Sequence, residues 1–191
     1  MDKVRSEKEK MLSGEDYRAM DAELVKERKK ARDLFQKYNK SSAGELKLRR
    51  EILKDLIPQQ GKDLFIEPPF YCDYGYNIRT GNNVFFNFNC VILDVMPVHI
   101  GDHVLFGPAV QVYTALHPMD WRERSGPTQS AKPVSIGSHV WIGGGAIICP
   151  GVSIGERSVI GAGSVVTRDI PAGVFAAGNP CRVVKKIEEK E

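Results

Sequence analysis

The sequence predicts a mainly β protein, a solenoid of short parallel strands that follows an N-terminal helical module. Three observations predict it. An isoleucine or valine recurs at every sixth position from Ile136 to Val166, and glycine directly follows several of these residues. Up to Ile57, by contrast, the apolar residues recur at helical spacing. We therefore expect two segments, a helical module at 1–57 and a β domain with a short C-terminal tail at 58–191.

The helical module is predicted to contain two amphipathic helices with apolar faces. One apolar stripe comprises Leu24, Ala31, Leu34, Phe35 and Tyr38, and a second comprises Leu46, Ile52, Leu53 and Leu56. Ser13 with Asp16, and Ser42 with Glu45, have the spacing of helix N-caps, and Pro58 ends the second helix. Two such helices are too thin to form a core alone, so they must pack on the β domain.

The period of six predicts a triangular coil in which each six-residue unit supplies one short strand and one corner. The repeating residues are Ile136, Ile142, Ile148, Ile154, Ile160 and Val166. Small or β-branched residues stand four positions after them, at Val140, Ala146, Val152, Ser158, Ser164 and Ile170. An earlier stretch repeats the pattern through Ile100, Phe106 and Val112, and a looser one runs through Ile78, Val84 and Cys90. Stacked coils of this kind bury a continuous apolar column.

The six-residue pattern resembles that of the left-handed parallel β-helix (hexapeptide repeats). This hand departs from the usual right-handed crossover rule. A right-handed solenoid rarely keeps so strict a period, and a sandwich of short strands would need turn signals every 8–12 residues. We therefore expect the β-helix.

An extended loop at about 113–133 interrupts the repeat. An insertion within a strict repeat is typically thrown out from one face, often the binding face. It contains His117, whose imidazole is a natural proton acceptor near neutral pH, although a loop histidine without a function is an equal alternative. His99, His103 and His139 lie at outward or corner positions of the repeat, where solvated polar residues are expected. No carboxylate cluster accompanies these histidines, so we expect no metal.

Composition restricts the remaining classes of function. The chain has 191 residues, of which 42% are hydrophobic and 27% charged, and its net charge of +3 gives no reason to expect a nucleic-acid partner. No apolar run approaches the roughly 20 residues that cross a bilayer, and the first residues lack the apolar core of a signal peptide. We therefore expect a cytoplasmic protein without a membrane partner. The four cysteines form no CxxC pair, which favours free thiols in a reducing compartment.

Several motifs resemble those of one family over nearly the whole chain. They are MLSGEDYRAMDAELVKERKKARDLFQKYN, EPPFYCDYGYNI, NFNC, AKPVSIG, VWIGGGAIICPGVSIG, VIGAGSVVTRDIP and GNPCRVVKKI. Together they are similar to the maltose O-acetyltransferase and galactoside O-acetyltransferase group of the hexapeptide-repeat acyltransferases. The resemblance implies an enzyme that transfers acetyl from acetyl-coenzyme A (acetyl-CoA) directly to a hydroxyl of a sugar such as maltose or glucose. It also implies a homotrimer with its sites at the interfaces.

The resemblance also assigns roles to residues. His117 takes the place of the general base, and Asn87 that of the residue that positions the acceptor and stabilises the transition state. Asp73, Asp94 and Asp21 are the remaining candidates for the acceptor pocket. Asp73 stands where the galactoside enzyme has a serine, and Val95 replaces a second aspartate, so the acceptor is left open. For the donor, the positions carried over are Gly144, Ala162, Thr167, Arg168, Arg182 and Lys185.

Three alternatives keep the fold but change the function. The acceptor can be a galactoside, a lipochitin oligosaccharide, an antibiotic hydroxyl or an amine. A carbonic anhydrase of this fold needs several zinc-binding histidines, and Arg122 stands where a second one would be expected near His117. A non-catalytic β-helix scaffold would tolerate loss of His117.

Overall fold

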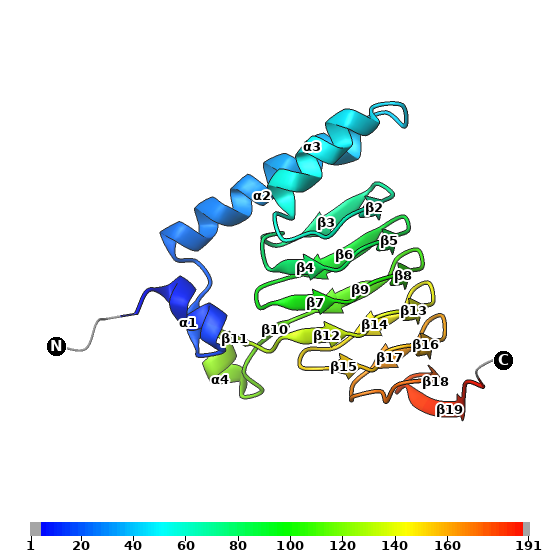
Figure 1. The fold of residues 1–191 in the computed structure, drawn as a ribbon. Coiled ribbons are helices and arrows are strands. Elements are labelled where there is room, and N and C mark those ends of the chain that lie inside the picture. Colours follow the sequence, from blue (N-terminus) through cyan, green and yellow to red (C-terminus); the bar gives the residue numbers. More distant parts are fainter. Residues whose placement is uncertain (1–4, 189–191) are drawn as a thin grey trace.

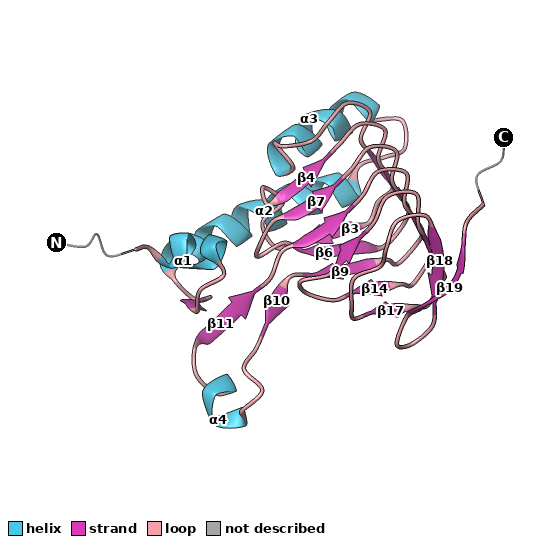
Figure 2. Cartoon of the chain, turned by 60° about the horizontal axis from the view of Figure 1, so that its bottom comes forward, coloured by secondary structure: helices cyan, strands magenta, loops and turns pink. Residues whose placement is uncertain are grey.

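The computed structural model describes residues 5–188, and most of its strands form the three faces of a triangular prism (Figures 1 and 2). Face 1 comprises β4 (Ile78–Thr80), β7 (Val98–Ile100), β12 (Val134–Ile136) and β15 (Ser153–Ile154). Face 2 comprises β2 (Phe65–Ile66), β5 (Phe85–Phe86), β8 (Leu105–Phe106), β13 (Trp141–Ile142), β16 (Val159–Ile160), β18 (Val174–Ala177) and β19 (Arg182–Lys186). Face 3 comprises β3 (Phe70–Cys72), β6 (Cys90–Leu93), β9 (Gln111–Tyr113), β14 (Ile147–Ile148) and β17 (Val165–Val166).

The chain visits faces 1, 2 and 3 in turn, so each coil stacks on the one before it. Neighbouring strands within a face are parallel, except for β19, which pairs antiparallel with β18. We call the corners that follow faces 1, 2 and 3 corners A, B and C. The mainly β fold of stacked hexapeptide coils predicted from the sequence is confirmed.

The repeat residues from Ile136 to Val166 all point into the prism and are buried. The residues four positions later are buried as well, and the two serines among them satisfy their hydroxyls. Ser158 donates to the Pro171 carbonyl (2.7 Å), and Ser164 donates to the Gly161 carbonyl (2.6 Å). These hydrogen bonds allow polar side chains to occupy an otherwise apolar column.

The register of the first coils differs from the sequence prediction. Ile78, Val84 and Cys90 are buried, but the residue that pairs with Ile100 is Thr80. Likewise Phe86 pairs with Phe106, and Ile92 pairs with Val112, so the predicted positions are two residues too early.

The cause of the shift is corner C, which is enlarged in the early coils. Eight positions separate Ile92 from Ile100, and twenty-four separate Val112 from Ile136, where six would continue the repeat. Between β3 and β17 the extra residues all fall at corner C, and the extended loop is the largest of these insertions.

The close approach of successive coils explains why position 143, at corner B, is a glycine. A Cβ on Gly143 would lie 2.5 Å from the main-chain nitrogen of Ala162 in the next coil. No side chain fits there, because the contacted atom belongs to the backbone. At corner A, His103 and His139 adopt positive φ values of 56° and 60° in successive coils.

The N-terminal module contains α1 (Glu7–Ser13), α2 (Ala22–Lys40) and α3 (Leu46–Leu56). Helices α2 and α3 lie over the β2–β3 end of the prism (Figure 1). Buried residues of both helices, including Tyr38 and Leu53, belong to the same apolar core as the coils. The prediction that the helices pack on the β domain is confirmed, and the boundary drawn at residue 57 falls at the C-cap of α3.

Some details of the helices were predicted wrongly. Ser13 ends α1 rather than beginning a helix, because Gly14 follows in the left-handed conformation, and the N-cap of α1 is Ser6. Only half of the second capping box forms, since the Glu45 carboxylate accepts the N–H of Ser42 (2.7 Å) while α3 has no side-chain N-cap bond. Leu46 is 46% exposed and lies outside the buried stripe.

The loop after β9 is an ordered ribbon rather than an irregular excursion. It contains β10 (Ala115–Leu116), α4 (Trp121–Arg124) and β11 (Thr128–Ala131). Strand β11 lies between β10 and the N-terminal strand β1 (Tyr17–Arg18), antiparallel to both. The ribbon projects from the prism, and α4 lies at its tip (Figure 2).

Candidate active site

The candidate base His117 follows β10 on the projecting ribbon and is exposed. Within α4, the Asp120 side chain accepts the N–H of Arg122 (2.7 Å) and caps the helix. Arg124 donates to the main-chain carbonyls of Pro118 (3.0 Å) and Met119 (2.9 Å), directly after the histidine. These bonds give the tip of the ribbon a defined shape next to His117.

Gln129 on β11 connects His117 to the N-terminal strand. Its Nε2 lies 3.5 Å from Nε2 of His117, and its Oε1 accepts a hydrogen bond from the Tyr17 hydroxyl (3.0 Å). Tyr17 is 1% exposed, and burial raises the pKa of its phenol well above the usual value, with Tyr74 and Asp73 adding to the shift. The hydroxyl therefore stays protonated and is a hydrogen-bond donor.

Asp73 and Asp94 lie together at corner C, in the turns that follow β3 and β6. Asp94 is fully buried, and its Oδ1 accepts the main-chain N–H groups of Asp73 (3.0 Å) and Tyr74 (2.9 Å). Burial raises the pKa of Asp94 to about 7, opposed by the N–H of Tyr74 and assisted by the charge of Asp73. In this arrangement the Asp94 carboxylate orders the turn that presents Asp73.

Asp73 itself is half-buried and faces cations of the helical module. Burial raises the pKa of its carboxyl, and Arg28 and Arg32 of α2 oppose that rise. Arg28 also donates to the Tyr74 hydroxyl (2.6 Å) and the Ala19 carbonyl (2.5 Å). Asp21 is the N-cap of α2, and its side chain accepts the N–H of Glu23 (3.0 Å).

Asn87 lies at corner B, directly after β5, and not beside His117. Its Oδ1 accepts the N–H of Phe88 (2.8 Å), and among residues 5–188 its Nδ2 has no hydrogen-bond partner. Gly144 and Ala162 occupy the same corner in later coils, after β13 and β16. Gly144 packs closely on the preceding coil, since a Cβ there would lie 3.1 Å from the Pro108 carbonyl oxygen.

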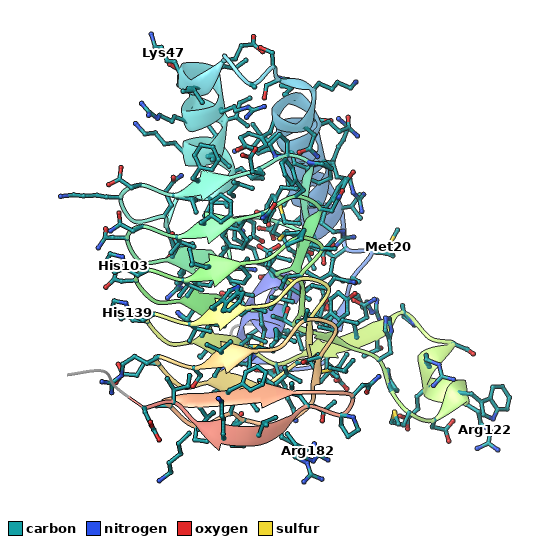
Figure 3. All side chains as sticks on the ribbon, turned by 90° about the vertical axis from the view of Figure 1, so that its right-hand side faces the viewer. Met20, Lys47, His103, Arg122, His139 and Arg182 are labelled. Carbon is teal, nitrogen blue, oxygen red and sulfur yellow. The ribbon has the colours of Figure 1, made fainter. Side chains whose placement is uncertain are left out.

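The remaining candidates for binding the donor, Thr167 and three cations, are all exposed and occupy two places. Thr167 and Arg168 follow β17 and therefore lie at corner C. Arg182 and Lys185 lie on β19, where they pair with Ala177 and Phe175 of β18. Arg182 thus stands close to corner B, at the C-terminal end of the prism (Figure 3).

One chain therefore divides the candidate residues between two corners of the prism. Asp73, Asp94, Arg168 and the ribbon with His117 belong to corner C, whereas Asn87, Gly144, Ala162 and Arg182 belong to corner B. Face 3 separates the two groups, because its strands run from corner B to corner C.

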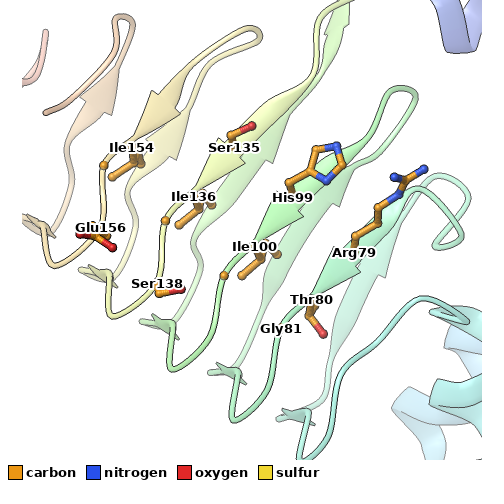
Figure 4. Close-up of a pocket in the computed structure, with 13 residues that line it drawn as sticks. Arg79, Thr80, Gly81, His99, Ile100, Ser135, Ile136, Ser138, Ile154 and Glu156 are labelled. Atoms are coloured by element: carbon orange, nitrogen blue, oxygen red, sulfur yellow. The ribbon is translucent and has the colours of Figure 1, made fainter. Parts of the chain in front are cut away.

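The remaining histidines lie away from the ribbon, as predicted. The rings of His103 and His139 stack at 5.0 Å on corner A (Figure 3). His99 lies on the outer side of face 1, where partial burial and the nearby Arg79 lower its pKa. It lines a shallow hollow with Arg79, Ser135 and Glu156, which includes none of the predicted site residues (Figure 4).

Sequence reasoning assigned no site role to Gln129, Tyr17 or Arg28. Gln129 lies in TQSA, which lacks the apolar alternation of a strand, so its position opposite His117 could not be read from the sequence.

Within residues 5–188, no three His, Cys, Asp or Glu side chains gather as potential metal ligands. No helix in this part of the chain is long and apolar enough to span a membrane.

Comparisons with known proteins agree with this architecture. A family model described as the maltose acetyltransferase hexapeptide capping motif matches residues 10–61, and one described as bacterial transferase hexapeptide (six repeats) matches residues 133–168. The chain is 50% identical to nodulation protein L of Rhizobium meliloti (strain 1021), over 94% of this chain and 98% of that protein.

Two solved structures are similar over nearly their full length. A maltose O-acetyltransferase from Clostridium difficile 630 superposes with a TM-score of 0.96 at 51% identity, covering 98% of this chain and 100% of that one. A galactoside acetyltransferase in complex with coenzyme A superposes with a TM-score of 0.93 at 39% identity, covering 96% and 92%.

The stacked six-residue coils, closed at one end by a helical cap, define a hexapeptide-repeat transferase. More narrowly, the chain belongs to the maltose and galactoside O-acetyltransferase group of the hexapeptide-repeat acyltransferases.

Proposed function

We propose that this protein is an acetyl-CoA-dependent O-acetyltransferase that acetylates a sugar hydroxyl by direct transfer. The observation that carries the proposal is the position of His117, an exposed imidazole on the ordered ribbon that leaves the prism at corner C. The similarity to a maltose O-acetyltransferase and to a galactoside acetyltransferase bound to coenzyme A supports the donor and the acceptor class.

In the proposed reaction, Nε2 of His117 takes the proton of the acceptor hydroxyl while its oxygen attacks the thioester carbonyl carbon. The C–O bond forms and the carbonyl oxygen becomes an oxyanion, which the Nδ2 group of Asn87 stabilises by a hydrogen bond. Collapse of the tetrahedral intermediate breaks the C–S bond. The thiolate of coenzyme A leaves and takes the proton back from His117. No acyl-enzyme is needed, since the thioester is already activated.

The separation of His117 from Asn87 favours a site shared between two copies. Corner C of one copy would bring the base and Asp73 to corner B of its neighbour, which carries Asn87, Gly144 and Ala162. Such a contact joins corner C of one copy to corner B of the next, and a head-to-tail interface of this kind forms either a closed ring or an open filament. We propose the closed ring of three copies, a homotrimer. Coenzyme A would then lie in the groove between copies, passing the small residues Gly144 and Ala162.

Cations on both sides of this groove suit the phosphates of the donor. Arg168 lies at corner C beside the hydroxyl of Thr167, and Arg182 lies on β19 near corner B. Lys185 lies further along β19, opposite Phe175. A guanidinium binds phosphate oxygens through paired N–H groups, so the two arginines are the principal candidates. On the acceptor side, Asp73 would accept hydrogen bonds from sugar hydroxyls, with Asp94 holding its turn and Asp21 at the start of α2.

The first test is thiol release from acetyl-CoA with a panel of acceptors. Release is expected to depend on added sugar, with maltose or glucose preferred over a galactoside, a chitin oligosaccharide or an aminoglycoside. Preference for one of the latter would keep the reaction and change the acceptor. If none of the hydroxyl compounds stimulates thiol release, the result favours the non-catalytic scaffold instead.

A second test asks whether the site is shared. His117→Ala and Asn87→Ala variants, each inactive alone, are unfolded together, refolded as a mixture and assayed. If base and oxyanion donor come from neighbouring copies, random mixing rebuilds about one quarter of the sites. If both residues served within one copy, the mixture would stay as inactive as its components.

A further inference from the structure

Tyr17, Gln129 and His117 form a row across three antiparallel strands. Tyr17 is the direct partner of Gln129 in the β1–β11 pair. In the β10–β11 pair, Ala115 faces Ala131 and Leu116 faces Ser130, so the next residue, His117, faces Gln129. Directly opposed residues in a sheet have side chains on the same face, about 5 Å apart at Cβ. The pairing of the N-terminal strand thus fixes which side chain lies beside the base.

The two ends of the Gln129 carboxamide are not interchangeable here. The Tyr17 hydroxyl is buried, stays protonated and donates to Oε1 of Gln129 (3.0 Å). Anchoring Oε1 on the phenol turns Nε2 of the amide towards His117, at 3.5 Å from its Nε2. An amide nitrogen donates and cannot accept, so this contact is a hydrogen bond only when the facing ring nitrogen carries the lone pair. In that tautomer the imidazole proton is on Nδ1.

We infer that Gln129 and Tyr17 are positioning residues that hold His117 as a base with its lone pair on Nε2. The inference rests on the proposed function. The contact of 3.5 Å is at the long limit for a hydrogen bond, which allows the acceptor hydroxyl to replace the amide N–H at Nε2 without a large cost. The N-terminal strand thereby contributes to catalysis through the side chain that it anchors, besides covering the ribbon.

The decisive variants are Gln129→Ala and Gln129→Glu. Alanine removes the donor, and we expect kcat to fall about tenfold through loss of orientation, with KM for acetyl-CoA unchanged. Glutamate keeps the shape but only accepts hydrogen bonds, so it draws the proton to Nε2 and blocks the base. We therefore expect Gln129→Glu to be slower than Gln129→Ala, the opposite of what a packing role predicts. Tyr17→Phe, which removes only the hydroxyl, should lower kcat by a few-fold.

Controls separate this inference from the proposed function. Ser130→Ala changes the neighbouring residue of β11, whose side chain lies on the other face, and should leave kcat and KM unchanged. Thermal unfolding checks that each variant is folded. If His117→Ala is inactive while Gln129→Glu matches wild type or exceeds Gln129→Ala, the positioning role is wrong and the reaction stands. If His117→Ala retains full activity, the proposed function itself fails.

Discussion

We expect His117→Ala to lower kcat for acetyl transfer by a factor on the order of 100 or more, which corresponds to about 2.7 kcal/mol of transition-state stabilisation. The alcohol must lose its proton as it attacks the thioester, and without the imidazole only water can take it. His117 lies on the ribbon and not on the faces that would hold coenzyme A, so donor binding should be nearly unchanged. Initial rates of thiol release measure the first quantity, and calorimetric titration with coenzyme A measures the second.

Two other histidines provide matched controls. His103 and His139 are also exposed, but they stack on each other at corner A, away from the ribbon. Their alanine variants should retain wild-type kcat. A His117→Ala variant that bound coenzyme A poorly but reacted at the normal rate once saturated would assign the residue to binding instead.

The largest expected effect on stability comes from Phe106→Ala. Phe106 is 1% exposed, and its ring stacks on Phe86 of the preceding coil at 4.1 Å between centroids. Truncation leaves a cavity at the axis of a rigid prism whose coils are held by main-chain hydrogen bonds. We expect the free energy of unfolding to fall by about 3–5 kcal/mol, measured by urea denaturation followed by circular dichroism.

The adjacent residue supplies the control for this prediction. Leu105 is on the same strand, faces outward and is 48% exposed. Leu105→Ala should lower the free energy of unfolding by less than about 1 kcal/mol. Equal losses in the two variants would mean that the prism axis is not where the coils gain their stability.

The sequence predicted the coils well because every repeat position is subject to the same local constraint. A residue at every sixth position must be apolar and fit the prism, so Ile136 to Val166 could be identified without any knowledge of long-range contacts. The register of Ile78, Val84 and Cys90 was missed because the enlarged corner C carries residues with no periodic constraint. The helix N-cap was assigned wrongly for a related reason. Ser6 and Ser13 both have acidic residues nearby, and it is the left-handed backbone at Gly14 that makes Ser13 the end of α1 and not the start of a helix.

The candidate site was predictable only in part. His117 could be singled out because it lies in the interruption of the repeat, whereas its surroundings depend on pairings between distant segments. Neither the partnership of Tyr17 with Gln129 nor the position of Arg28 beside Tyr74 leaves a periodic signature. The separation of Asn87 from His117 likewise follows from the order of the faces and not from any local motif.

The pairing of β1 with β11 also bears on how the protein folds. Successive coils join residues about one coil apart in sequence, as in the eighteen positions from Ile136 to Ile154, and such contacts form with a small loss of chain entropy. Tyr17 and Gln129, by contrast, are 112 residues apart. The pairing of β1 with β11 must therefore wait until the intervening coils have stacked, whereas the β10–β11 hairpin joins residues close in sequence. We expect the β1–β11 pairing, which anchors Gln129 beside the base, to form last and to open first under native conditions, with lower protection against amide exchange than the prism.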